Sequence, residues 1–276
     1  MNRRSWNEAT KAHNSHKGDQ AAFFRRGGST LFPEERGLLG DLAGKTLLHL
    51  QCNCGQDSLS IAKHLGADVT GLDISDEAIR FARKLSNDSG IDARFIRADI
   101  YDYFLDKREQ FNLVFSSYGV LCWLSDLAAW GRGIASCLAS GGRFVLVDFH
   151  PALSMFNETW ELRYDFMGGT AYEFESGVGD YVALTGAAAE IDKLLPGLQD
   201  FHNPHPGVEY IWGIAEIVTA LLEAGLSLSH LTEYNYCNGF KPMSDMVELS
   251  ARRFAMPAHL PQNIPLMFSL MAEKTV

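Results

Sequence analysis

Four short apolar segments of the sequence lead into residues whose side chains can hydrogen-bond or carry charge. The segments are 46–50, 68–72, 93–96 and 111–115, and the polar residues at their ends are His49 to Asp57, Asp73, Asp99, and Ser116 to Tyr118. An acid after the second segment suits a bidentate contact with ribose hydroxyls, and an acid after the third can accept from an adenine amino group. The next residues, Ile74 and Ile100, offer aliphatic faces to a purine ring. The pattern therefore predicts an adenosine pocket.

These residues can meet only if the segments are neighbouring strands of one open sheet, in which ligands bind beyond the carboxyl ends. Helical periodicity alternates with the apolar segments, at 56–65, after Ser75 and after Ser125, and a fifth strand is expected at 143–149. An irregular stretch follows. Order then resumes with a helix whose inward face runs from Ile211 to Leu222 and two strands, 226–234 and 265–271. The expected fold class is α/β, with a mostly parallel seven-stranded sheet and helices on both faces.

Changes in this pattern divide the chain into four parts. Residues 1–44 form an arm that is polar at first and then rich in turn residues, with aromatic residues to bury, and 45–150 form the cofactor-binding core. Residues 151–207 lack regular alternation and are expected to cover a substrate, because long segments of this kind inside domains are usually functional. Residues 208–276 complete the same domain.

Composition narrows the classes of function. The chain has 276 residues, 46% of them hydrophobic, which excludes disorder, and its net charge of −10 argues against a nucleic-acid partner. No apolar stretch is long enough to span a membrane, and the first twenty residues are too polar for a secretory signal, so we expect a cytoplasmic protein. Five scattered cysteines are expected to be reduced thiols, and no metal site is expected.

The sequence resembles the class I S-adenosylmethionine-dependent methyltransferases. The resemblance is carried by LLHLQCNCGQDS, VTGLD, RFIRAD, FNLVFSSYGVLCWL and LASGGRFVLVDFHP over residues 45–150, and it returns at 208–274. It implies a Rossmann-like sheet and S-adenosylmethionine as the cofactor. The family's first loop is usually acid-x-Gly-x-Gly-x-Gly, whereas here His49 stands for the acid and only Gly55 is retained.

The HLQC...GQD form looks like a variant found in a branch of bacterial methyltransferases, which makes it a modified cofactor loop. Gln51 and Asn53 stand at two glycine positions. Asparagine tolerates the left-handed backbone that glycine adopts, and the Gln51 amide can meet the amino-acid end of the cofactor. The predicted cofactor-binding residues are His49, Gln51, Cys52, Asn53, Gly55, Gln56, Asp57, Asp73, Ile74, Asp99, Ile100, Ser116 and Ser117.

Methyl transfer from a sulfonium is an in-line displacement, so catalysis can come largely from orientation, with a base needed only for some acceptors. Predicted catalytic residues are Tyr118 and His150, which follow the fourth and fifth strands, and Glu173, whose aromatic neighbours in the sequence would raise its pKa. Predicted substrate contacts come from the arm, the core and the segment 151–207: His16, Trp123, Tyr172, His202 and His205. The acceptor is expected to be a small molecule with a nitrogen, oxygen or carbon nucleophile.

Two other functions fit parts of this pattern. A non-catalytic S-adenosylmethionine-binding protein, acting as a sensor or assembly partner, is favoured only by the altered first loop. A nicotinamide-dependent oxidoreductase would need Gly-x-Gly-x-x-Gly for its pyrophosphate, and Cys52-Asn53-Cys54-Gly55-Gln56 does not supply it. The sequence leaves the acceptor and the oligomeric state open, a homodimer included.

Overall fold

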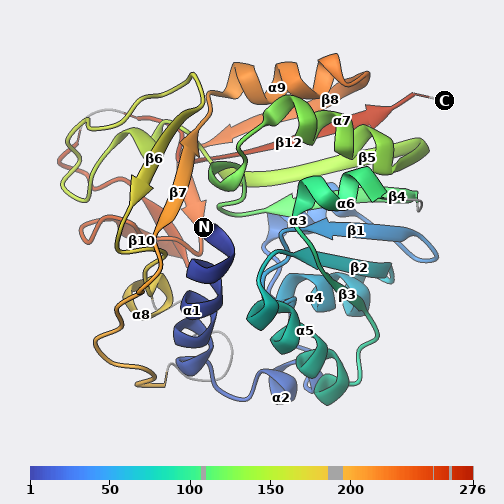
Figure 1. Ribbon diagram of the computed structural model, residues 1–276, viewed down its shortest axis with the longest axis horizontal. Helices are drawn as coiled ribbons and strands as arrows, with labels where there is room; N and C mark the ends of the chain where they lie inside the picture. Colours follow the sequence, from blue (N-terminus) through green and yellow to red (C-terminus); the bar gives the residue numbers. More distant parts are fainter. Residues whose placement is uncertain (107–109, 186–194, 251, 261–262, 276) are drawn as a thin grey trace.

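A computed structural model describes residues 1–106, 110–185, 195–250, 252–260 and 263–275. Its centre is a seven-stranded sheet in the order β3-β2-β1-β4-β5-β12-β8 (Figure 1). The strands are β1 (Thr46–Leu50), β2 (Asp68–Asp73), β3 (Arg94–Arg97), β4 (Phe111–Ser117), β5 (Leu138–Phe149), β8 (Leu226–Tyr234) and β12 (Met267–Lys274). β12 runs antiparallel to both of its neighbours, whereas the pairs from β3 to β5 are parallel. The predicted fold class is confirmed.

Helices cover both faces of the sheet, which is why its central strands are nearly continuous apolar runs. One face packs on α6 (Ile100–Asp106), α7 (Leu127–Cys137) and α9 (Ile214–Glu223). The other packs on α2 (Gln20–Arg25), α3 (Pro33–Leu39), α4 (Gln56–Leu65) and α5 (Asp76–Ser89). Where α7 and α9 cross, a Cβ on Gly131 would stand 2.3 Å from the Ala220 carbonyl oxygen, so only glycine allows this approach.

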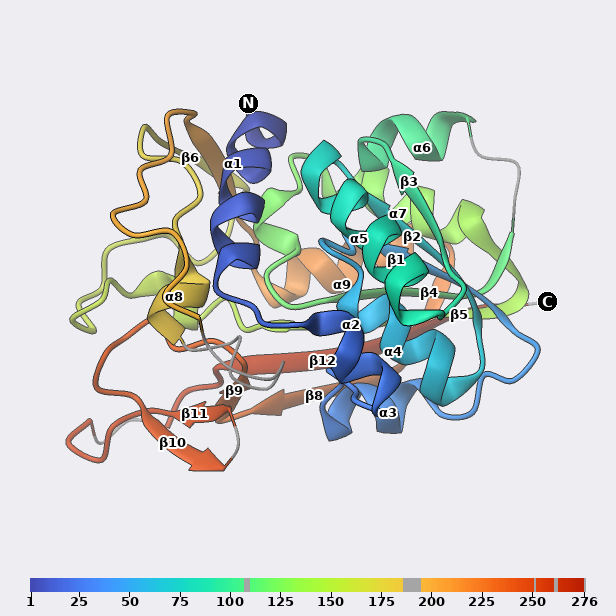
Figure 2. The ribbon, with the colours of Figure 1, turned by 90° about the horizontal axis from the view of Figure 1, so that it is seen from below.

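The arm and the segment between β5 and α9, here called the insert, form a cover on one side of the sheet. The arm begins with α1 (Asn2–Ser15), which lies between α5 and the insert (Figure 2). The insert contains η2 (Leu153–Met155), β6 (Thr170–Phe174), α8 (Tyr181–Thr185) and β7 (Gly207–Ile211), and η1 (Leu121–Trp123) lies next to β7. β6 and β7 pair as an antiparallel two-stranded sheet.

Two details of the predicted elements need correction. Ile211 was expected on the inward face of a helix, but it ends β7, and the helix begins at Ile214 after Gly213. The sequence predicts no strand between 234 and 265, where the structure has a three-stranded sheet of β9 (Tyr236–Asn238), β10 (Val247–Ser250) and β11 (Arg253–Ala255). Strands of three or four residues are too short to give a clear period of two.

In the described part of the chain, none of the helices combines the length and the apolar character that crossing a membrane would require. All five cysteines are free thiols.

Candidate functional site

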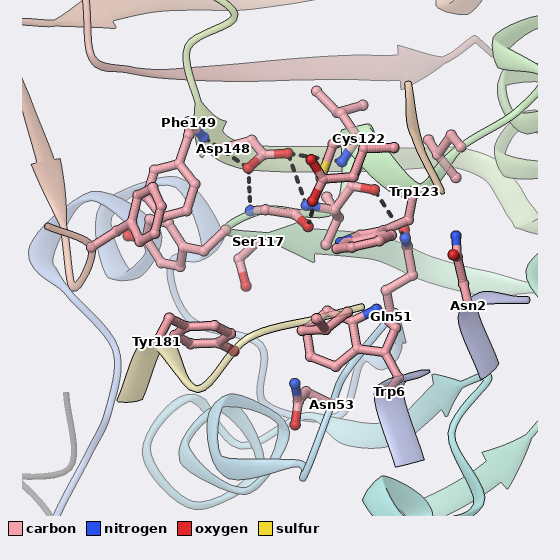
Figure 3. A pocket seen from close by; sticks show the side chains of 18 of the residues that line it. Asn2, Trp6, Gln51, Asn53, Ser117, Cys122, Trp123, Asp148, Phe149 and Tyr181 are labelled. Atoms are coloured by element: carbon pink, nitrogen blue, oxygen red, sulfur yellow. Dashed lines mark hydrogen bonds between the residues drawn. The ribbon is translucent and has the colours of Figure 1, made fainter. Parts of the chain in front are cut away.

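A cavity of about 1100 Å³ opens at the carboxyl ends of β1, β2, β4 and β5, beneath α1 and the insert (Figure 3). It collects most of the residues that the sequence placed at one site. Those that line it are His49, Gln51, Cys52, Asn53, Gln56, Asp57, Asp73, Ile74, Asp99, Ile100, Ser117, Tyr118, Trp123, Tyr172 and Glu173. The polar strand ends therefore converge as the parallel topology requires.

The loop after β1 replaces glycines without changing the backbone that they would provide. Gln51, Asn53 and Gly55 alternate along the loop with φ angles of 52°, 49° and 76°, all in the left-handed region. The expectation that Asn53 adopts this conformation is confirmed, and Gln51 adopts it too. Gly55 must remain glycine, because a Cβ there would stand 2.6 Å from the Phe95 ring.

The Gln51 amide has one satisfied and one unsatisfied group. Its Nε2 donates to the Val120 carbonyl oxygen at 3.0 Å, which fixes the orientation of the side chain. Its Oε1 is buried and accepts no hydrogen bond from any described residue. A buried acceptor without a donor costs about 1–3 kcal/mol, so a ligand ammonium or N–H at this position would relieve the cost.

Asp73 and Asp99 both line this cavity. The Asp73 carboxylate accepts the backbone N–H groups of Asn53 and Ser75, each at 2.8 Å, and so holds the first loop against the start of α5. Burial raises the pKa of Asp73 to about 6, against the opposing effect of these N–H groups. Asp99 accepts the backbone N–H of Tyr101 at 2.9 Å. Ile74 and Ile100 follow the two acids and also line the cavity.

His49, at the end of β1, is a neutral imidazole. It is almost fully buried, and its Nδ1 lies 2.8 Å from the Ser58 hydroxyl at the start of α4. Burial lowers the pKa of His49 to about 4, despite the nearby Asp57 carboxylate. A hydrogen-bonded neutral ring therefore stands here in place of an anion.

The other half of the cavity is aromatic. Trp6 of α1 meets Trp123 of η1 edge-on, with ring centroids 5.3 Å apart, and Trp123 lies 6.4 Å from the Phe174 ring of β6. The Tyr118 hydroxyl accepts a hydrogen bond from the Asn238 amide at 3.0 Å. Burial beside Glu35 raises the pKa of Tyr118 well above its ordinary value, so the phenol is protonated.

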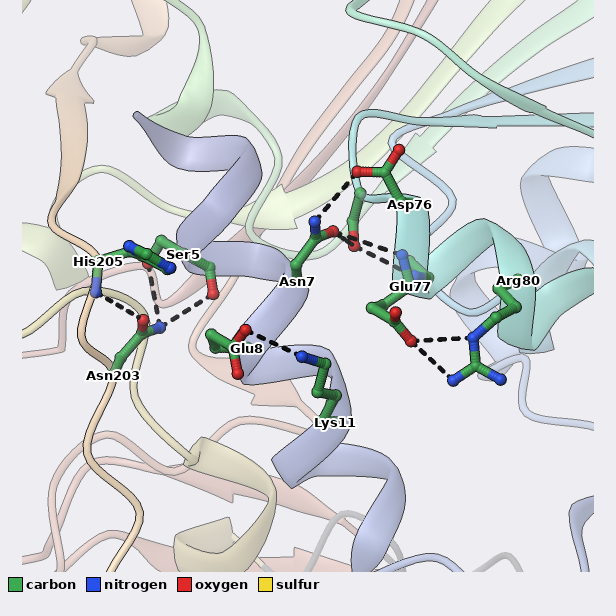
Figure 4. A network of polar contacts seen from close by, with 11 residues as sticks. Ser5, Asn7, Glu8, Lys11, Asp76, Glu77, Arg80, Asn203 and His205 are labelled. Carbon is green, nitrogen blue, oxygen red and sulfur yellow. Dashed lines mark hydrogen bonds and ion pairs between the residues drawn. The ribbon is translucent and has the colours of Figure 1, made fainter.

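Helix α1 is attached on both sides of the cavity (Figure 4). On the core side, the Asn7 amide accepts from the Ser75 hydroxyl at 2.7 Å and donates to Asp76 at 3.0 Å. On the insert side, Asn203 donates to the Ser5 carbonyl oxygen at 2.9 Å. One helix therefore joins the two walls and carries Trp6 into the space between them.

Comparison with known proteins agrees with this geometry. Residues 47–142 match a family model described as a methyltransferase domain. This segment of the chain is therefore similar in sequence to methyltransferase domains. Over 106 residues it is 32% identical to a ubiquinone biosynthesis O-methyltransferase of Xanthomonas euvesicatoria pv. vesicatoria, covering 38% of this chain and 44% of that protein. Over 110 residues it is 27% identical to methyltransferase phqN of Penicillium fellutanum, covering 37% of this chain and 31% of that protein. The matches thus span less than half the length of these curated relatives.

Solved structures share the fold over much more of the chain. An S-adenosylmethionine-dependent methyltransferase from Mesorhizobium loti superposes with a TM-score of 0.57 at 21% identity, covering 90% of this chain and 99% of that one. The [4+2]-cyclase SpnF superposes with a TM-score of 0.53 at 14% identity, covering 86% and 77%. The methyltransferase fold thus also occurs in a protein named for a different reaction.

Six predicted site residues lie outside the cavity lining. The His150 ring is held by Glu233 at 2.9 Å and by the backbone N–H of Ala152, and His16 is held by Asp180 at 2.7 Å. These histidines are buried in structural contacts that the sequence could not reveal. The others are His202, which is exposed, His205, which is half-buried, Ser116, which is fully buried, and Gly55, which shapes the loop.

Glu173 lines the cavity, but aromatic rings do not bury its carboxylate as the sequence predicts. It is exposed, whereas Tyr172 and Phe174 are half-buried, because successive side chains of β6 point to opposite faces. Its catalytic role remains a prediction.

Trp6, Asp148 and Glu209 also line the cavity, although the sequence patterns described above do not point to them. Asp148 accepts backbone N–H groups from Val120, Leu121 and Phe149, and burial raises its pKa to about 6. Trp6 shares a helix face with His13, seven residues on, and their rings meet edge-on at 6.2 Å. That spacing was the available signal for Trp6.

Proposed function

We propose that this protein transfers a methyl group from S-adenosylmethionine to a small-molecule acceptor. The observation that carries the proposal is that Gln51, Asp73 and Asp99 line one cavity together with the aromatic side chains of α1, η1 and β6. Its volume of about 1100 Å³ exceeds the roughly 300–1000 Å³ of pockets that hold one small-molecule ligand. There is therefore room for a cofactor and a second molecule.

The residues of the first half fit the cofactor. Asp73 and Asp99 would hold the ribose and the adenine amino group, with Ile74 and Ile100 at the purine, and the unpartnered Gln51 Oε1 would accept from the amino-acid end. S-adenosylmethionine supplies an electrophilic methyl group when bound. The aromatic walls exclude water and fix the acceptor, an orientation effect that reaches about 7–11 kcal/mol in well-aligned systems.

The acceptor class follows from the second half of the cavity. Its lining is dominated by aromatic rings from Trp6, Trp123, Phe174, Phe149 and Phe240, which suits a flat or moderately hydrophobic molecule. The relative from Xanthomonas is named as an O-methyltransferase of ubiquinone biosynthesis, a small-molecule pathway. These observations favour a metabolite over a macromolecule.

A direct test is calorimetry with S-adenosylhomocysteine, followed by incubation of the protein with methyl-labelled S-adenosylmethionine and a metabolite extract. We expect micromolar or tighter binding of S-adenosylhomocysteine and transfer of label to a small organic product. Absence of heat with both the cofactor and its product would refute the proposal.

A second candidate is a binding protein that uses the same cavity without methyl transfer. The two non-glycine residues of the first loop, Gln51 and Asn53, favour it, since they add side chains where the family has none. Binding of S-adenosylhomocysteine without label transfer to any compound of the extract would support this candidate.

A further inference from the structure

Glu209 is a cavity-lining carboxylate without a partner in the described part of the chain. It lies in the middle of β7, and its carboxylate forms no hydrogen bond or ion pair with the side chain or backbone of any described residue. Burial raises the pKa of Glu209, and no cation among the described residues offsets this effect. Neither the cofactor residues nor the core packing accounts for a carboxylate at this position.

The register of the two-stranded sheet shows which way Glu209 points. It pairs with Tyr172 across the strands, and the next pair on the same face is Gly207 with Phe174. The Phe174 ring faces Trp123, and β7 packs against η1, whose Cys122 thiol lies within electrostatic reach of Glu209. The carboxylate therefore stands among aromatic rings on the acceptor side of the cavity.

Three other charged groups that line the cavity, Asp148, Arg3 and Arg252, have contacts with other residues. Asp148, which like Glu209 acts electrostatically on the Cys122 thiol, accepts several backbone N–H groups. Arg3 pairs with Asp76, and the Arg252 guanidinium lies over the Phe32 ring, 4.6 Å from its centroid. An ionised carboxylate in a partly dry aromatic site is costly unless a cation neutralises it, and aromatic faces themselves attract cations.

We propose that Glu209, with the rings of Tyr172, Phe174 and Trp123, binds the ammonium group of the methyl acceptor, which is therefore a small-molecule amine. This inference rests on the proposed function, because it takes the aromatic half of the cavity as the acceptor site. Glu209 would then recognise the substrate by an ion pair with its ammonium group, and the ring faces would surround that group.

The test uses three probes that share a phenyl ring and differ in charge: 2-phenylethylamine, 2-phenylethanol and 3-phenylpropionate. Each is titrated calorimetrically into the full chain saturated with S-adenosylhomocysteine. We expect the amine to bind about tenfold or more tightly than the alcohol, and the propionate to bind most weakly. Equal binding of amine and alcohol, or no binding of the amine, would overturn the inference.

Two variants locate the effect. Glu209→Gln should weaken binding of the amine about tenfold or more and leave the alcohol unaffected, whereas Glu175→Gln, an equal charge change at an exposed position directly after β6, should preserve the preference. Retained amine preference in Glu209→Gln would refute the assignment. If S-adenosylhomocysteine itself does not bind the wild-type chain, the proposed function fails; if it binds and the amine preference is absent, only this inference fails. The wild-type probe series decides the matter even if Glu209→Gln does not fold.

Discussion

Replacing Asp73 with asparagine should weaken S-adenosylhomocysteine binding by about 10- to 150-fold. Each carboxylate oxygen already accepts one backbone N–H at 2.8 Å, from Asn53 or Ser75, and has a further lone pair for a ribose hydroxyl. Asparagine keeps one acceptor oxygen but loses the charge and the second acceptor. One hydrogen bond to a charged group contributes about 1.5–3 kcal/mol, which corresponds to this range of dissociation constants.

The assay is calorimetry at pH 7.5 on the wild type, on Asp73→Asn, and on Asp68→Asn, which changes an exposed acid at the start of the same strand. A pH series adds a second readout. Because the pKa of Asp73 is about 6, the carboxylate is anionic above this value and is protonated as the pH falls through it. Wild-type affinity should therefore fall between pH 7 and pH 5, and the variant should lose this dependence. An affinity of Asp73→Asn within twofold of the wild type would refute the ribose assignment.

Three further changes test other parts of the structure. His49 has a pKa near 4 when folded, so its contribution to the free energy of unfolding is present above pH 6.5 and is lost as the pH falls toward 4. His49→Gln should reduce the pH dependence of that free energy by about 2 kcal/mol between pH 7.5 and 5, measured by urea denaturation. Asn203→Ala removes a buried amide that holds Ser5, and should cost about 1–3 kcal/mol and speed tryptic cleavage within α1 about tenfold. Gly131→Ala should cost about 2 kcal/mol or more in thermal denaturation, because Ala220 backbone blocks the new methyl group.

Matched controls separate these effects from general damage. Gly37→Ala meets no atom within 4 Å and should leave the melting temperature unchanged or higher, and Asn87→Ala changes an exposed asparagine. Unchanged cleavage in Asn203→Ala, equal melting of the two glycine variants, or an unaltered pH slope in His49→Gln would each contradict the corresponding reasoning.

The fold and the convergence of the polar strand ends on one cavity could be predicted from the sequence because their signals are local. Apolar runs that end in Asp73 and Asp99 place both acids at one sheet edge whatever the details of packing. Asn53 could be assigned a left-handed backbone from its chemistry alone, and its φ of 49° agrees. Gln51 shows that a residue without this preference can be held in the same conformation, here with its amide bonded to Val120.

The acceptor half was harder to predict because it depends on contacts between distant segments. The aromatic neighbours of Glu173 in the sequence predict a carboxylate surrounded by rings. In a strand, however, adjacent side chains point to the opposite face. Glu209, which does share a face with Tyr172, could be found only from the register of β6 against β7. His150 and His16 likewise depend on partners 83 and 164 residues away, which no local pattern reveals.

The double attachment of α1 couples binding in the two halves of the cavity. The same helix is bonded to α5, beside the predicted nucleotide, and to the insert, beside the predicted acceptor. A molecule that strengthens one attachment also favours the other, because both belong to one helix, and linkage makes the benefit mutual. We therefore expect cooperative binding of the two substrates.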